Sequence, residues 1–164
     1  MPLLHIYDGS DRMIVQTAEQ RGVVNRVPID NADNFISIMD NLLKAGTAFD
    51  RVLFETHGSP GKIYFGKKSI NAEFWRKIKG RYNLLLLKHA RLYFNGCNVA
   101  EDSVGWEFLE AAAGAFMTSG GGEVFGQTSM GFGNPFNGHV IHLWGVTKKL
   151  YIDESGRIVE RFEQ

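Results

Sequence analysis

The sequence predicts one α/β domain, a three-layer α/β/α sandwich in which helices cover both faces of a mostly parallel central sheet of caspase-like topology, with a C-terminal hairpin. Short apolar runs, typical of buried strands, alternate with segments whose apolar residues recur at helical spacing. The length of 164 residues fits one domain with a sizeable core. No internal repeat or linker divides the sequence, so residues 1–164 are expected to form a single unit.

The first elements are two strands and a helix. Residues 3–7 are a short apolar run that stops at a turn signal, and they are predicted to form a buried strand. Residues 23–29 are the second predicted strand. Asp30 or Asn31 can cap the helix predicted over residues 35–43, where apolar side chains lie on one face.

The next elements are two strands joined by an arm and a helix. Residues 49–55 contain a short continuous apolar run at 52–54, as expected for a central parallel strand. Residues 62–65 are predicted to form a small hairpin arm. Asn71 can cap a helix with apolar residues at helical spacing over 74–82. Residues 90–94 are then the next buried strand.

The C-terminal third begins with a helix. Asp102 or Ser103 is expected to cap a helix whose apolar face spans residues 106–116. A strand over residues 123–127 and a loop rich in Gly and Asn over residues 130–138 follow. The extended segments predicted after that loop are residues 140–146, 150–153 and 157–162.

The charge balance and the cysteine count limit the partners and the compartment. Lys and Arg together number 18, as do Asp and Glu, so no basic excess favours nucleic acid or acidic lipid as a partner. A single Cys excludes an internal disulfide and favours a reducing compartment. We find neither a membrane-spanning run nor a cleavable leader, so we expect a cytoplasmic protein or one exported without a signal peptide. The oligomeric state is left open.

His57 and Cys97 are the candidate catalytic residues. Each directly follows the last apolar residues of a predicted strand, and the 40 residues between them (97 − 57) suit a crossover between parallel strands. Functional groups of open α/β sheets gather beyond the carboxyl ends of the strands. Neighbouring strands lie about 5 Å apart, so both side chains can face one cleft.

This pair suits nucleophilic catalysis. An imidazole can take the proton of a thiol, the thiolate can attack a carbonyl, and the imidazolium can then protonate the leaving amine. The oxyanion that forms needs backbone N–H donors, for which Gly58 and Cys97 itself are candidates. This chemistry requires no cofactor and no metal.

Two motifs extend the case. The sequence His-Gly-Ser-Pro-Gly at 57–61 and the sequence Gly-Cys-Asn-Val-Ala at 96–100 resemble the uncharacterised caspase-like domain of large bacterial surface and adhesin proteins. The resemblance extends over residues 35–131. It implies a fold and chemistry similar to those of caspases, gingipains, separases and legumains, with His57 as general base and acid, Cys97 as nucleophile and Gly58 as oxyanion donor. The Gln-Ala-Cys-Arg-Gly signature of caspases is absent, so no preference for aspartate is carried over.

Further polar residues are candidates for a substrate pocket. Asp8 and Asp11 follow the first strand, and one of them could line the pocket or orient His57; the alternative is a turn or helix-cap role. Thr128 and Ser129 end another strand and are either part of a specificity pocket beside Cys97 or plain turn residues.

Two neighbouring features were also considered. The loop over residues 132–137 is either a flap over the cleft or a connector. His139 and His142 would point to opposite faces of a strand, which argues against a metal site.

The sequence therefore predicts a cysteine endopeptidase that acts on a protein or peptide substrate. Such an enzyme could serve as a bacterial effector or as a self-processing protease. Two alternatives stay open: a catalytically inactive protein-binding member of the same fold, and a cysteine hydrolase or acyltransferase acting on a non-peptide ester or amide. A redox role has less support, because no second Cys exists to resolve an oxidised thiol.

Overall fold

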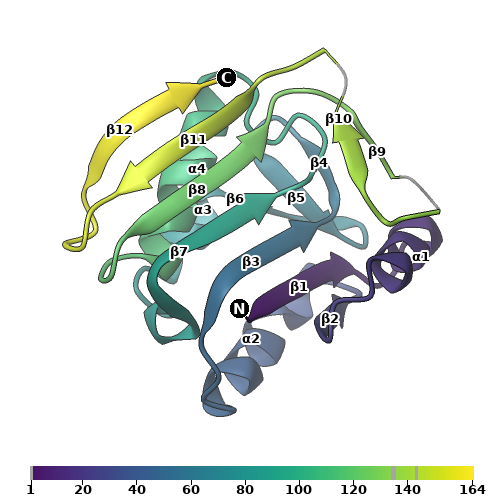
Figure 1. Cartoon of the computed structure of the whole chain (residues 1–164), viewed down its shortest axis with the longest axis horizontal. Coiled ribbons are helices and arrows are strands. Elements are labelled where there is room, and N and C mark those ends of the chain that lie inside the picture. The colour runs from purple at the N-terminus through teal and green to yellow at the C-terminus, as the bar shows by residue number, and fades with distance from the viewer. Residues whose placement is uncertain (1, 134–135, 143) are drawn as a thin grey trace.

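A computed structural model describes residues 2–133, 136–142 and 144–164, and it shows the predicted α/β architecture with a mostly parallel central sheet. The strands of this sheet are β1 (Leu3–Asp8), β2 (Asn25–Ile29), β3 (Phe49–Glu55), β7 (Leu86–Phe94), β8 (Gly122–Gln127), β11 (Thr147–Ile152) and β12 (Ile158–Glu163). Their order is β12-β11-β8-β7-β3-β1-β2 (Figure 1). The strands from β8 to β2 are parallel, and the antiparallel pair β11–β12 is the predicted C-terminal hairpin.

Helices lie on both faces of the sheet. They are α1 (Arg12–Arg21), α2 (Phe35–Lys44), α3 (Ala72–Lys77) and α4 (Asp102–Phe116). The chain passes from β1 outward to β2 and then returns past β1 to β3, β7 and β8. Because crossovers between parallel strands are right-handed, α1 covers one face, while α2, α3 and α4 cover the other (Figure 1).

Two smaller sheets lie beyond the carboxyl ends of the parallel strands (Figure 1). One contains β4 (His57–Ser59), β5 (Lys62–Phe65) and β6 (Lys68–Asn71) in that order. The other is a two-stranded arm of β9 (Gly131–Gly133) and β10 (Val140–His142). Residues 134–135, which come between these two strands in the sequence, lie outside the described residues.

The core is an aromatic cluster between the sheet and the three helices α2, α3 and α4. Phe54 lies one residue before the end of β3, and Phe94 is the last residue of β7. Their rings stack with centroids 4.9 Å apart. Trp75 of α3 packs edge-on against Phe54, and Phe116 of α4 closes the cluster. All four side chains are almost fully buried. Because aromatic side chains bury the largest apolar areas, this cluster fixes the strand ends from which His57 and Cys97 emerge.

The helix α1 is the main element that the sequence analysis missed. Its signals were nevertheless present. Asp11 caps the helix by accepting a hydrogen bond from the Ile14 N–H at 3.0 Å, and Gly22 ends it in the left-handed conformation with φ of 67°. The loop signal around Asp11 concealed a helix start, because Asp favours both turns and N-caps.

Other element boundaries also differ from the prediction. The helix α3 ends at Lys77, well short of residue 82, and the chain turns at Gly80 with φ of 73°. Neither Asp102 nor Ser103 caps α4, because Asp102 is already its first residue and Glu101 precedes it without a side-chain cap. Of the two residues predicted to cap the helix over 35–43, Asn31 is a cap, but of a 3₁₀ turn (Ala32–Asn34) that precedes α2.

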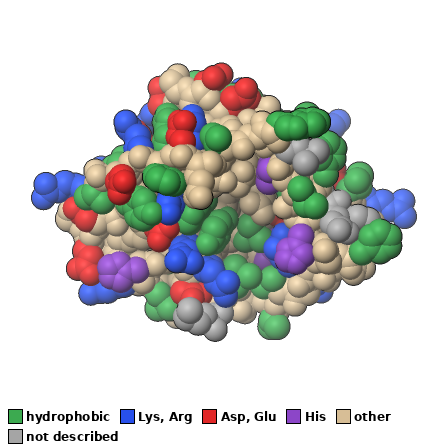
Figure 2. Space-filling view, turned by 45° about the horizontal axis from the view of Figure 1, so that its top comes forward, with side chains coloured by type: hydrophobic (Ala, Val, Ile, Leu, Met, Phe, Trp, Pro, Cys, Tyr) green, Lys and Arg blue, Asp and Glu red, His purple; other side chains and the backbone are tan. Residues whose placement is uncertain are grey.

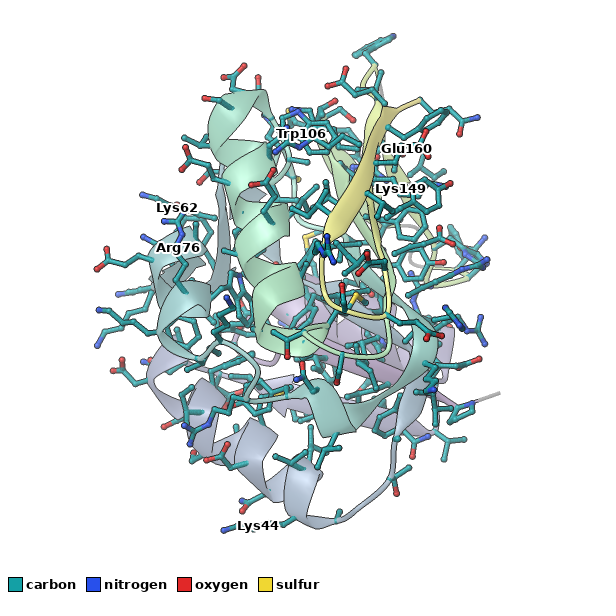
Figure 3. All side chains as sticks on the ribbon, turned by 90° about the vertical axis from the view of Figure 1, so that its left-hand side faces the viewer. Lys44, Lys62, Arg76, Trp106, Lys149 and Glu160 are labelled. Atoms are coloured by element: carbon teal, nitrogen blue, oxygen red, sulfur yellow. The ribbon has the colours of Figure 1, made fainter. Side chains whose placement is uncertain are left out.

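The C-terminal hairpin is fastened to α4 through Trp106. The Nζ atom of Lys148 lies 4.8 Å from the centre of the Trp106 ring, and the Arg161 guanidinium lies 5.8 Å from it. Figure 3 shows Trp106 between α4 and β12, with Lys149 on the opposite side of the hairpin.

The face of the molecule that Figure 2 shows is mixed in charge and polarity. Acidic, basic and hydrophobic side chains are interspersed in Figure 2, in keeping with the balanced charge of the chain. Within the described part of the chain, no helix is both long and apolar enough to cross a bilayer.

Candidate active site

The two loops that carry His57 and Cys97 run side by side. The strands β3 and β7 are parallel neighbours, with Phe54 opposite Phe94. The Asn95 N–H continues the ladder by donating to the Phe54 carbonyl at 2.9 Å. A Cβ on Gly58 would lie only 2.6 Å from the Cys97 carbonyl oxygen, so these two backbones are in direct contact. The sheet thus brings the predicted pair to one edge.

Both side chains line the same cavity of about 180 Å³. Its polar wall holds Asp11, Glu55 and Asn95 in addition to the imidazole and the thiol. Its apolar wall comes from α1 and from the β9–β10 arm, through residues such as Ile14, Phe132 and Val140. The cavity is therefore closed on one side by the helix and on the other by the arm.

The thiol of Cys97 contacts the arm and not the imidazole. Its Sγ atom accepts a hydrogen bond from the Gly131 N–H at 3.2 Å and lies 3.7 Å from the Gly131 carbonyl oxygen. No hydrogen bond joins Sγ to the His57 ring. The Cys97 N–H makes no hydrogen bond with any described residue and can serve as an oxyanion donor.

The imidazole of His57 has Asp11 as its hydrogen-bond partner. The Nε2 atom lies 2.8 Å from Asp11 Oδ2, and the His57 side chain is otherwise 61% exposed. Asp11 also caps α1 through its other oxygen. Asp11 therefore takes both of the roles that were considered for it, as helix cap and as partner of the ring.

Asp8 lies away from the thiol, and it lines a neighbouring cavity together with Asp11 and His57. Its carboxylate accepts hydrogen bonds from the N–H and the hydroxyl of Ser10 and, at 3.2 Å, from the Gly66 N–H. It is almost fully buried, lines no part of the His57–Cys97 cavity, and joins the end of β1 to the β5–β6 turn.

Glu55 is the second carboxylate on the cavity wall. It accepts a hydrogen bond from His5 Nε2 at 2.8 Å and lies 3.5 Å from Arg21 Nε, all on its Oε2 atom. This ion pair connects the end of β3 to the last turn of α1, so Glu55 braces the same helix that Asp11 caps.

Thr128 and Ser129 line a second cavity of about 440 Å³, beside the first. Its walls also include Asn98, which follows Cys97, and Phe132, which lines both cavities. The Thr128 hydroxyl is engaged at the base of the arm, donating to the Val146 carbonyl at 3.0 Å. These residues are thus placed beside the thiol, separated from the first cavity by Phe132.

The place of Gly131 and of the α1 residues in the wall of the cavity was not predicted from the sequence. The signals for α1 were the Asp11 cap and the helical spacing of the apolar residues Ile14 and Ala18. The contact of Gly131 with the thiol has no local signal, because it joins the Cys97 side chain to a backbone N–H that lies 34 residues away in the chain.

The described residues include no group of His, Cys, Asp and Glu side chains arranged to hold a metal ion. The His142 ring instead packs against Gly131, where a Cβ would lie 2.7 Å from the ring, and burial lowers the pKa of His142.

We expect Gly58→Ala to change the reactivity of the Cys97 thiol. The new Cβ would meet the Cys97 carbonyl oxygen at 2.6 Å and its nitrogen at 3.0 Å, and backbone atoms cannot rotate aside. The loop carrying Cys97 must therefore shift. Because the chain has one Cys, the rate of iodoacetamide labelling reports directly on this thiol. An unchanged labelling rate in a folded Gly58→Ala protein would contradict the expectation.

Comparisons with known proteins identify a family but no function. A family model described as a domain of unknown function (DUF4347) matches residues 9–119, which include His57, Cys97 and the crossover between them. No curated protein matches the chain, and no solved structure matches it.

Proposed function

Since the chain belongs to the DUF4347 family, whose description names no activity, we propose from the geometry of its site that it is a cysteine peptidase. The observation that carries the proposal is the shared cavity: a thiol and an imidazole from two neighbouring strand ends line it together. The sequence resemblance to caspase-like peptidases supports the same assignment.

The chemistry proceeds in two stages. His57 takes the proton of the Cys97 thiol, and the thiolate attacks the scissile carbonyl to form an S–C bond. The C–N bond breaks as the imidazolium gives its proton to the leaving amine. In the second stage, His57 takes a proton from water, whose oxygen attacks the thioester. The C–S bond then breaks, and the thiolate leaves and regains a proton.

A rotation of the thiol must precede the first stage. In the free protein Sγ is hydrogen-bonded to Gly131, and it has to turn toward the His57 ring. Catalytic hydrogen bonds of free enzymes are often long and tighten only when substrate binds, so the resting arrangement is compatible with the reaction.

The edge of β9 favours an extended peptide as the substrate. Both the N–H and the carbonyl of Gly131 point at Cys97, and therefore away from the β10 partner. Since paired and unpaired residues alternate in an antiparallel ladder, Gly133 presents its backbone groups to the same side. No other strand pairs with this edge among the described residues. A peptide added there would place one of its carbonyls beside the thiol.

The same pairing offers a reason for the thiol to move. A peptide that bonds to the Gly131 N–H displaces the sulfur from it, because one N–H cannot serve both acceptors fully. Binding of an extended substrate would thus release the thiol for His57.

A peptide library ending in a vinyl sulfone tests the proposal. The expected result is covalent addition at Cys97, seen as one added peptide mass in the intact protein, with far faster labelling by preferred peptides than by a capped amino acid. Equal labelling by peptides and by the capped amino acid would contradict a peptide site and favour a small ester or amide as the substrate.

Backbone methylation of the best peptide tests the strand pairing. An N-methyl group on the amide that pairs with the Gly131 carbonyl should slow labelling by about tenfold or more, because it removes a hydrogen bond and introduces a clash. The matched control carries the N-methyl group on the next amide, which points away from β9. Equal rates for the two methylated peptides would reject the pairing.

A further inference from the structure

We propose that Asp11 is a positioning residue for His57, which holds the ring so that Nδ1 is the nitrogen that exchanges protons with Cys97 and the leaving amine. This inference rests on the proposed peptidase function. The site then has three interacting groups instead of two. The carboxylate comes from the start of α1, and the imidazole and the thiol come from beyond the ends of β3 and β7.

The tautomer follows from the contact. An ionised carboxylate has no proton to donate, so the hydrogen bond of 2.8 Å requires that His57 Nε2 carries the proton. The other ring nitrogen, Nδ1, is then the basic one in the neutral ring. The ring is mostly exposed and has no other hydrogen-bond partner among the described residues, so Asp11 is what limits its rotation.

The carboxylate is itself held in place. Its Oδ1 atom accepts the Ile14 N–H at 3.0 Å, while Oδ2 faces the ring. The positive end of the α1 dipole lies at this position and favours a negative charge. Asp11 therefore cannot turn away from His57 without leaving the first turn of the helix uncapped.

The protonation of Asp11 suits this role at neutral pH. Burial acts to raise the pKa of Asp11, but hydrogen bonds from the His57 ring and from the Ile14 N–H lower it, and the resulting pKa lies below its ordinary value. The stabilisation that the carboxylate provides is thus present above about pH 4 and is lost as the pH falls through the lowered pKa. When His57 takes the thiol proton, the adjacent negative charge offsets the charge of the imidazolium.

The neighbouring carboxylates cannot substitute for Asp11. Asp8 is occupied by Ser10 and Gly66, and Glu55 is occupied by His5 and Arg21.

Helix capping and ring positioning can be separated by substitution. Asn and Ser cap helices about as well as Asp, so Asp11→Asn and Asp11→Ser should retain α1 and the melting temperature. Both remove the charge, and Ser is too short to reach the ring. Asp11→Ala removes the cap as well and should cost about 1 kcal/mol.

Kinetics on the best peptide substrate give the decisive comparison. We expect kcat to fall by about 10² to 10⁴-fold in Asp11→Asn and Asp11→Ser, with little change in KM, because the wrong tautomer or a free ring impairs proton transfer. Added formate should restore part of the kcat of Asp11→Ser and leave its melting temperature unchanged. A purely structural Asp11 would give no such rescue.

Two results would overturn the inference. One is a kcat within about threefold of wild type in Asp11→Asn, and the other is a wild-type His57 ring protonated at Nδ1 in long-range ¹H–¹⁵N spectra at neutral pH. The NMR measurement does not depend on turnover. If Asp11→Asn stays active while Cys97→Ala does not, the inference fails and the peptidase proposal survives. If Cys97→Ala also stays active, the proposed function itself fails.

Discussion

Replacing Cys97 with Ala should lower peptide hydrolysis by at least about a thousandfold, the largest effect on activity that we expect from any single change. In the proposed mechanism the thiolate forms the bond to the substrate carbonyl, and no second Cys exists to take its place. Cys97→Ser should be almost as inactive, because a hydroxyl ionises far less readily than a thiol.

The fold should tolerate the loss of the sulfur. Cys97 is half-buried, and its sulfur is bonded to a backbone N–H at the edge of a cavity, outside the aromatic core. Cys97→Ala should therefore keep the melting temperature of the wild type while losing turnover. Glu160→Gln, an exposed change on β12, serves as the control and should match wild type in both measurements. Wild-type turnover in Cys97→Ala would remove the thiol from the mechanism.

Replacing Gly105 with Ala should cause the largest loss of stability. A Cβ at this position would lie 2.1 Å from the Ala100 carbonyl carbon and 2.2 Å from its oxygen. Both are backbone atoms of the loop that carries Cys97, and Ala100 is itself fixed by its N–H bond to the Gln127 carbonyl at 2.9 Å. The helix α4 and this loop must therefore separate. We expect a loss of about 3 kcal/mol or more in the free energy of unfolding.

Gly114 in the same helix provides a matched control. A Cβ there would approach nothing closer than Lys79 Cγ at 4.0 Å. Because Ala has a higher helix propensity than Gly, Gly114→Ala should stabilise the protein by about 0.5–1 kcal/mol. Thermal unfolding followed by circular dichroism measures both changes. Similar melting temperatures for the two variants would show that the close approach at Gly105 does not restrict the residue.

Much of the sheet was predictable because its strands carry strong local signals. Residues 49–55 contain the apolar run 52–54, and residues 90–94 contain the apolar run 92–94. The parallel pairing of the two strands follows from the connection that joins them. The position of His57 and Cys97 beyond these runs needed no further information.

The contacts inside the site could not be read from the sequence to the same degree. The pairing of Asp11 with His57 spans 46 residues, and it requires a helix whose start was interpreted as a loop. The contact between Gly131 and Cys97 depends on where the arm folds back, which tertiary packing decides. Helix boundaries at Lys77 and Asp102 were misplaced because Asn, Asp and Gly act in both turns and caps.

The distribution of the site along the chain has a consequence for biosynthesis. The cavity takes its walls from the start of α1, the ends of β3 and β7, and the arm that begins at Gly131. A chain emerging from the ribosome contains the imidazole and the thiol before it contains the arm, and the walls of the cavity are not all present until residues 131–142 have been made. The proposed reaction therefore depends on residues made after the thiol itself.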